Sequence, residues 1–161
     1  GLEGALERRP GTTETETPIR RIVVGTDFSE PSYPALKAAA STARREGATV
    51  FLAHVIDPLP HIGPGLDAVM GTDALREGME EYAKQHLKEL RESHFAGLSV
   101  ETHILYSPNA GMAMTDFAER VEADLIVVGT HGRNGIQRLM LGSVAEKVTR
   151  LAPCSVLVVR A

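Results

Sequence analysis

Short runs of β-branched and aliphatic residues alternate along this chain with segments of helical periodicity, and this alternation constrains the fold most strongly. The expected strands cover residues 19–25, 49–55, 98–105, 124–129 and 155–159. The expected helices cover residues 35–46, 73–96, 108–121 and a last segment that begins near residue 143. Strands that alternate with helices form βαβ units with right-handed crossovers. We therefore predict an α/β fold built on a five-stranded parallel sheet.

Hydrophobic patterns within the expected elements suggest their positions. The run at 124–129 is the most continuously apolar and is expected near the centre of the sheet, whereas 98–105 alternates and fits an edge. Gly47 is expected to end the first helix. Ser107 is expected to cap the third helix, with Pro108 at its first position.

Composition sets the size and class of the protein. The 161 residues suffice for one domain with a sizeable core, expected over residues 18–161. Residues 1–17 are rich in Gly, Thr and Glu, which predicts a flexible leader or a cloning remnant. The net charge of −4 argues against a nucleic-acid partner or a membrane surface. No apolar run reaches the length of a membrane span, and a cytosolic protein is expected.

Cysteine and histidine usage gives little sign of a metal centre. The single cysteine, Cys154, excludes an internal disulfide framework and a multi-cysteine metal site, and its apolar neighbours predict a small buried side chain. His86 and His94 share a face of the second helix without metal-ligand spacing and are expected to be ordinary helix-surface residues. His54 is expected to pack at a strand end, and His131 is expected to be a surface loop residue.

A glycine-bearing segment lies between the fourth expected strand and the last expected helix. Gly129 ends the strand, Gly132 follows after two residues, and Gly142 precedes Ser143 after nine more. Glycines allow the backbone to approach a ligand closely, and the N–H groups at a helix start favour phosphate. The spacing predicts a phosphate-binding loop.

Other interpretations of these residues remain open. The segment is not a Walker A loop, since no Gly-Lys-Ser/Thr follows the strand, and the first strand ends at Gly25 without the dinucleotide fingerprint. Ser143 and Glu146 also fit a capping box, which can coexist with a phosphate contact. Asp27, two residues before Ser29, fits a turn or cap residue.

The spacing Gly-x2-Gly-x9-Gly-Ser resembles the nucleotide-binding signature of the ATP-binding universal stress proteins. Residues 26–29, 54–57 and 153–159 resemble segments of the same family in the same order, so that the resemblance covers about residues 19–160. It implies a flavodoxin-like three-layer fold, as in adenine nucleotide α-hydrolase-like proteins, with strand order 3-2-1-4-5. It also implies that ATP binds where the strand order reverses, the usual ligand position in open α/β sheets.

Carried over position by position, the resemblance implies an ATP site formed by Thr26, Asp27, Val55, Val128, Gly129, Gly132, Arg133, Gly142, Ser143 and Val144. Asp27 would lie beside the nucleoside and Val55 would form an apolar wall for the adenine. The glycines, Ser143 and the N–H of Val144 would hold the phosphates, which Arg133 could also reach. No carboxylate cage for a metal is visible, so Mg²⁺ would be held by phosphate oxygens and water.

The resemblance implies a nucleotide-dependent stress sensor or regulator with no catalytic residue assigned. ATP is the expected ligand, with ADP or AMP as alternatives, and the effector is an unidentified regulatory protein. A slow ATPase or nucleotidyl-transferring enzyme and a nucleotide-free dimeric scaffold are the alternative functions. The last strand would be an exposed edge in a monomer. We therefore expect a homodimer in which residues Val156–Val159 pair with their symmetry mates.

Overall fold

The computed structural model describes residues 17–58, 72–130 and 141–161. The strands are β1 (Arg21–Gly25), β2 (Thr49–Ile56), β3 (Val100–Tyr106), β4 (Leu125–Gly129) and β5 (Ser155–Val159). The helices are α1 (Tyr33–Glu46), α3 (Thr72–His94), α4 (Ala110–Arg120) and α5 (Ser143–Leu151), with a 3-10 turn, η1 (Glu30–Ser32), before α1. All five strands are parallel, in the order β3-β2-β1-β4-β5. The predicted fold class and strand order are confirmed.

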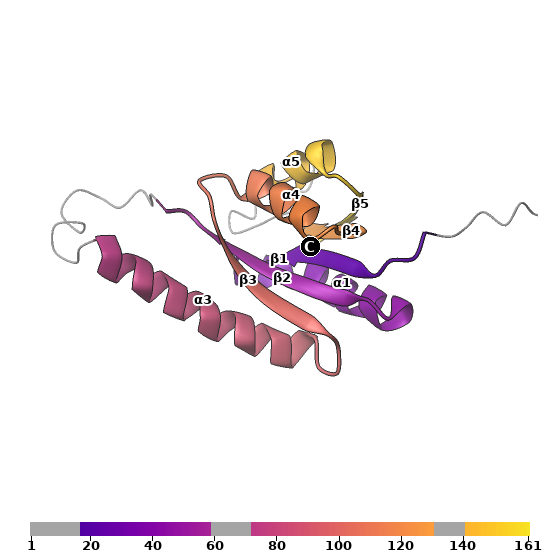
Figure 1. The fold of residues 1–161 in the computed structure, drawn as a ribbon, viewed down its shortest axis with the longest axis horizontal. Helices are drawn as coiled ribbons and strands as arrows, with labels where there is room; N and C mark the ends of the chain where they lie inside the picture. The colour runs from indigo at the N-terminus through magenta and orange to yellow at the C-terminus, as the bar shows by residue number, and fades with distance from the viewer. Residues whose placement is uncertain (1–16, 59–71, 131–140) are drawn as a thin grey trace, which may run out of the picture.

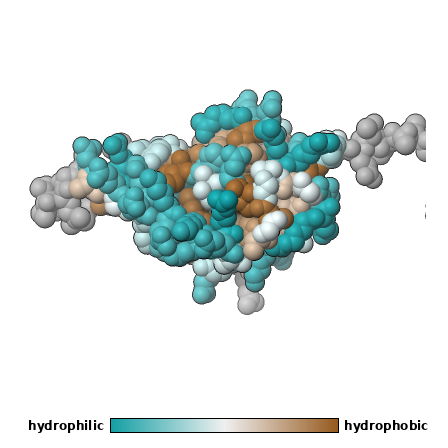
Figure 2. Space-filling model, turned by 60° about the horizontal axis from the view of Figure 1, so that its bottom comes forward, coloured by the Kyte–Doolittle hydropathy of each residue, from teal (hydrophilic) through white to brown (hydrophobic). Residues whose placement is uncertain are grey.

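Helices cover both faces of the sheet. α1 and α3 lie on one face, and α4 and α5 lie on the other (Figure 1). Successive strand residues point to opposite faces, so Ile22 and Val24 join the core under α1 and α3, while Val23 joins the core under α4 and α5. This double cover explains why the β1 and β4 sequences are continuously apolar rather than alternating. On the face shown in Figure 2, apolar residues gather in the middle and hydrophilic residues surround them.

The edges and the centre of the sheet follow the hydrophobic patterns. β3 forms one edge, as its alternation predicts. β4 is an interior strand between β1 and β5, as its continuous apolar sequence predicts. β5 forms the other edge, where Leu157 is 39% exposed. Cys154, just before β5, is only partly buried, contrary to the prediction, because it lies at this open edge; partial burial still raises the pKa of its thiol.

Two helix ends test the capping predictions. Gly47 ends α1 in a left-handed conformation with φ of 68°, as predicted. The prediction for α4 is wrong, because Asn109 is the N-cap and its side chain accepts a hydrogen bond from the Met112 amide at 2.9 Å. Ser107 instead bonds the backbone of Asn109, so Pro108 lies before the helix and not within it.

Two further predictions from the sequence concern the leader and membrane-spanning helices. Residues 1–16 of the predicted leader, and residues 59–71 between β2 and α3, lie outside the described residues. Across the described ranges, every helix is too short or too polar to cross a membrane.

Asp124 fastens the start of β1 to the start of β4. Its Oδ2 accepts hydrogen bonds from the backbone amides of Arg20 at 2.9 Å and Arg21 at 3.0 Å. We expect Asp124→Ala to lower the free energy of unfolding by about 1–2 kcal/mol, because two amides lose their acceptor. Urea denaturation followed by circular dichroism measures this loss. Asp124→Asn, which keeps one acceptor oxygen, should lose less, and equal stability of all three proteins would contradict the prediction.

Candidate nucleotide site at the carboxyl ends of β1 and β4

The strand order brings together the segments that leave β1 and β4. β1 pairs with both β2 and β4, with Val24 opposite Val127. The turn that begins at Thr26 and the segment that begins at Gly129 therefore start side by side at the carboxyl edge of the sheet (Figure 1). Strand order reverses here, and ligands of open α/β sheets bind at such points. The sequence-predicted site residues that the structure describes follow or end β1, β2 and β4, or begin α5.

The turn after β1 is held by a small polar network. Thr26 is buried, and its hydroxyl oxygen accepts a hydrogen bond from the Phe28 amide at 3.0 Å. The Ser32 hydroxyl donates to the Ser29 carbonyl at 2.7 Å, which leaves its oxygen as acceptor for the Thr26 hydroxyl at 3.0 Å. Asp27 accepts from both the amide and the hydroxyl of Ser29. Thr26 and Asp27 thus both shape the turn, and their contact with a nucleotide stays a prediction.

The end of β2 supplies both an apolar side chain and an imidazole. Val55 is half-buried and packs against the core under α4 and α5. His54 lies on the other side of the strand, where its Nδ1 donates to the Thr26 carbonyl at 2.8 Å. That direction follows from chemistry, since a carbonyl oxygen can only accept, so Nδ1 carries the proton. His54 therefore packs at the strand end, as predicted, and also fixes the β1 turn.

Thr130 connects the end of β4 to β5 and to α5. Its amide donates to the Val159 carbonyl at 2.9 Å, and its hydroxyl accepts from the Ala161 amide at 3.3 Å. Its carbonyl accepts from the Gly142 amide at 2.6 Å. The start of α5 is thereby held against the end of β4, next to the buried Val128.

The first turn of α5 lacks a side-chain cap. The N-cap residue is Gly142, which has no side chain that could accept a hydrogen bond from the helix amides. The first intrahelical bond runs from the Glu146 amide to the Gly142 carbonyl at 3.0 Å. The capping-box interpretation is wrong, because Ser143 is already helical and Glu146 pairs with Arg150 at 3.2 Å. Among the described residues, nothing accepts a hydrogen bond from the amides of Ser143 and Val144, and both residues are exposed. Such a helix start, with the positive end of its dipole, favours an anion.

The rest of the predicted phosphate loop is not placed. Gly132, Arg133 and His131 lie in residues 131–140, outside the described residues. In the three described ranges, no group of three or more His, Cys, Asp or Glu side chains is placed to hold a metal ion.

An aromatic cluster, which the sequence patterns did not predict, lies beside the β1 turn. Phe28 stacks on His54 with ring centroids 4.1 Å apart, and Tyr82 stacks on His86 at 3.8 Å. The sequence predicted that His86 and His94 are ordinary surface residues of the helix. This prediction is wrong, because both side chains line a cavity. The i, i+4 spacing of Tyr82, His86, Leu90 and His94 was the signal for one continuous helix face.

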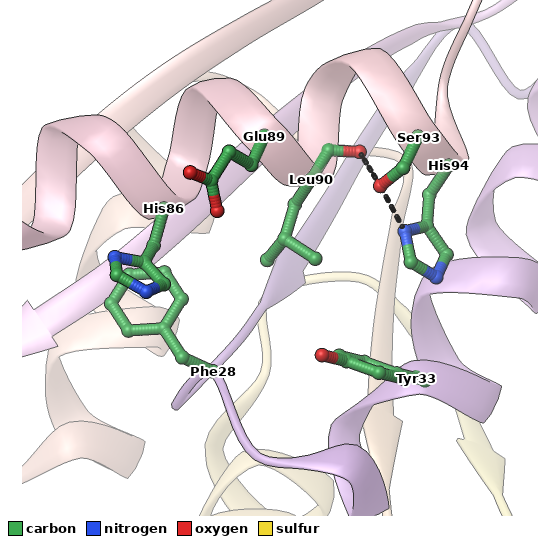
Figure 3. Close-up of a pocket in the computed structure, with 7 residues that line it drawn as sticks. All are labelled: Phe28, Tyr33, His86, Glu89, Leu90, Ser93 and His94. Atoms are coloured by element: carbon green, nitrogen blue, oxygen red, sulfur yellow. Dashed lines mark hydrogen bonds between the residues drawn. The ribbon is translucent and has the colours of Figure 1, made fainter.

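The cavity lies between α3 and the segment that joins β1 to α1. It measures about 170 Å³ and is lined by Phe28, Tyr33, His86, Glu89, Leu90, Ser93 and His94 (Figure 3). The ring of His94 lies 5.2 Å from that of Tyr33 and bonds to the Ser93 hydroxyl at 2.9 Å. Partial burial, with a smaller effect from the positive charge of Lys37, lowers the pKa of His94 below its ordinary value.

Comparisons with known proteins agree with this geometry. Residues 18–160 match the sequence profile of the Universal stress protein family. The chain is 36% identical over 146 residues to a universal stress protein from Methanocaldococcus jannaschii, an alignment that covers 90% of this chain and 84% of that protein.

Solved structures of the family have the same fold. A universal stress protein from Lactobacillus plantarum superposes with a TM-score of 0.74 at 28% identity, over 89% of this chain and 99% of that one. The universal stress protein from Archaeoglobus fulgidus in complex with dAMP superposes with a TM-score of 0.58 at 27% identity, over 89% and 99% of the two chains. The profile match spans most of the chain, and the fold and strand order are those that the resemblance implied. The chain belongs to the universal stress protein family.

Proposed function

We propose that this protein binds ATP at the carboxyl ends of β1 and β4 and acts, through the bound nucleotide, as a regulator in the response to stress. The observation that carries the proposal is the uncapped first turn of α5, where the amides of two exposed residues, Ser143 and Val144, have no acceptor among the described residues. Phosphate groups are among the anions that such helix starts bind. The dAMP complex of the Archaeoglobus fulgidus relative supports an adenine nucleotide as the ligand class.

The proposed site divides between the nucleoside and the phosphates. The amides of Ser143 and Val144 would donate to phosphate oxygens, and Gly132 and Arg133 would complete the phosphate contacts. Asp27 would lie beside the nucleoside, close to the apolar side chain of Val55. Mg²⁺ would enter with the phosphates and keep water ligands, because it needs few protein ligands when phosphate oxygens bind it.

Calorimetric titration of the purified protein with MgATP tests the proposal. At a nucleotide concentration about 100-fold above the dissociation constant, binding should stabilise the fold by about 2.7 kcal/mol. For a domain of this size the melting temperature should then rise by about 5–10 °C. A rise with dAMP but not with MgATP would correct the choice of ligand. Absence of any heat or shift with either nucleotide would refute nucleotide binding and favour the scaffold alternative, whereas steady phosphate release would identify a slow ATPase.

We also propose that the protein forms a homodimer through β5. This edge strand is continuously apolar from Val156 to Val159, and its side chains are partly exposed. The Val159 carbonyl bonds to Thr130, so residues 155, 157 and 159 direct their backbone groups toward β4. Those of Val156 and Val158 therefore point outward from the sheet, where a second β5 could pair with them.

Proline at position 158 provides a selective test of this pairing. Val158→Pro removes an outward N–H and leaves the ladder with β4 intact, since proline is tolerated on edge strands at such positions. Sedimentation at micromolar concentration should show twice the chain mass of 17.3 kDa for the unmodified protein and the single mass for Val158→Pro. Val158→Ala keeps the N–H and should stay dimeric. A monomeric unmodified protein, or a dimeric proline variant, would exclude this interface.

A further inference from the structure

Phe28 joins three elements that are distant in sequence. Its ring stacks on His54 of β2 at 4.1 Å with an interplanar angle of 27°, and lies 5.3 Å from the ring of His86 on α3. Tyr82, one helical turn before His86, meets the same ring edge-on at 5.8 Å. Figure 3 shows Phe28 and His86 overlapping at one end of the cavity. The turn after β1 is thus clamped between the end of β2 and a helix.

The backbone at Phe28 needs this support. Phe28 has φ of 67°, in the left-handed region that side chains other than glycine rarely adopt, and such a conformation persists only where surrounding contacts hold it. The amides of Phe28 and of the next residue both form hydrogen bonds within the turn. The Phe28 N–H donates to the Thr26 hydroxyl, and the Ser29 N–H donates to the Asp27 carboxylate. The Asp27 carboxylate is thus hydrogen-bonded to the residue that directly follows this left-handed position.

Phe28 lies at the margin of the core under α1 and α3. The residue is only partly buried, and one side of its ring borders the 170 Å³ cavity, so it is not enclosed by close packing. His54, the ring beneath it, is itself tied to the Thr26 carbonyl at 2.8 Å. The turn is therefore held by mutual contacts among Thr26, Phe28 and His54. On α3, His86 and Tyr82 also contact the Phe28 ring.

We propose that Phe28 is a positioning residue for the nucleotide site: its stacking on His54 and its tilted contact with His86 hold Asp27 in the orientation that receives the nucleoside. This inference rests on the proposed function. It adds that α3, which supplies none of the predicted ATP contacts, contributes to affinity through the aromatic rings that it places on Phe28.

Calorimetry with MgATP on substituted full-length chains gives the first test. Aromatic pairs contribute beyond the area that they bury, so Phe28→Leu, which keeps an apolar side chain but loses stacking, should bind about tenfold more weakly. Phe28→Tyr should stay within about twofold of the unmodified chain, because the stack is retained. His86→Ala should weaken binding in the same direction. Lys88→Ala removes an exposed side chain from the same helix and serves as the control that leaves affinity unchanged.

Hydrogen exchange in the nucleotide-free protein gives a second test that does not depend on ATP. In Phe28→Leu the amides of Phe28 and Ser29 should exchange faster, while those of the buried strand residues Ile22 and Val23 keep their rates. If the unmodified chain binds no nucleotide, the proposed function fails and the exchange result still decides whether the clamp holds the turn. If Phe28→Leu only lowers the melting temperature, with affinity and local exchange unchanged, the ring merely fills space and the positioning role is refuted.

Discussion

Ser143→Pro is expected to weaken MgATP binding by about 10- to 150-fold while the nucleotide-free protein keeps or slightly raises its melting temperature. Ser143 is the first residue of α5, the position at which helices accept proline most readily. The preceding residue, Gly142, has φ of −59° and ψ of 160°, an extended conformation that a following proline requires. The substitution therefore deletes one amide donor and preserves the helix.

The size of the effect follows from the hydrogen bond that is lost. A hydrogen bond to a charged group contributes about 1.5–3 kcal/mol, and each 1.4 kcal/mol is about tenfold in affinity. Ser143→Ala removes only the hydroxyl and separates its contribution from that of the amide. Calorimetric titration of both variants, with melting curves measured beforehand, makes the comparison. An unchanged affinity for Ser143→Pro would show that the phosphates do not contact this amide.

Gly111→Ala is expected to lower the free energy of unfolding by about 1–2 kcal/mol, although alanine favours helices more than glycine does. Gly111 lies in the first turn of α4, where a Cβ atom would sit 2.6 Å from Cβ and 2.8 Å from Cγ of Lys147 on α5. The two helices must then move apart, and overpacking of this kind costs about 1–3 kcal/mol. Because α5 begins at Ser143, its displacement should also reduce nucleotide affinity.

Gly78 provides the matched control for this substitution. It lies within α3, and a Cβ atom added there would have no neighbour within 4 Å. Gly78→Ala should therefore raise the free energy of unfolding by about 0.5–1 kcal/mol, the ordinary gain in a helix interior. Urea denaturation of the two alanine variants should give changes of opposite sign. Stabilisation by both would show that α4 and α5 can separate at no cost.

Hydrophobic patterning predicted most of the strands and helices. The continuous apolar run of β4 indicated an interior strand and the alternation in β3 indicated an edge, whereas the strand order was implied by the family resemblance. Helix ends were less predictable, because several neighbouring residues can cap the same helix. Ser107 and Asn109 both suit an N-cap, and only the backbone path after Pro108 selected Asn109.

The site was predictable in part for a related reason. The strand order implied by the family resemblance placed Asp27 and Gly129 at the ends of adjacent strands, and this order is observed. The capping box failed because the pattern of Ser143 and Glu146 does not specify which residue begins the helix, and Glu146 found a partner in Arg150. The ring contacts of Phe28 depend on a left-handed backbone and on side chains of α3 that lie more than fifty positions later in the chain, and local sequence patterns indicate neither.

Thr130 has a thermodynamic consequence for the proposed assembly. Its backbone and hydroxyl bond to the end of β5 and to the residue before α5, so Thr130 connects the strand of the proposed interface to the helix of the proposed phosphate contacts. Linkage between two such equilibria is reciprocal: a nucleotide that tightens subunit association by some factor must bind the associated form more tightly by the same factor. The apparent ATP affinity would then vary with protein concentration. The size of this variation would measure the coupling between nucleotide binding and subunit association.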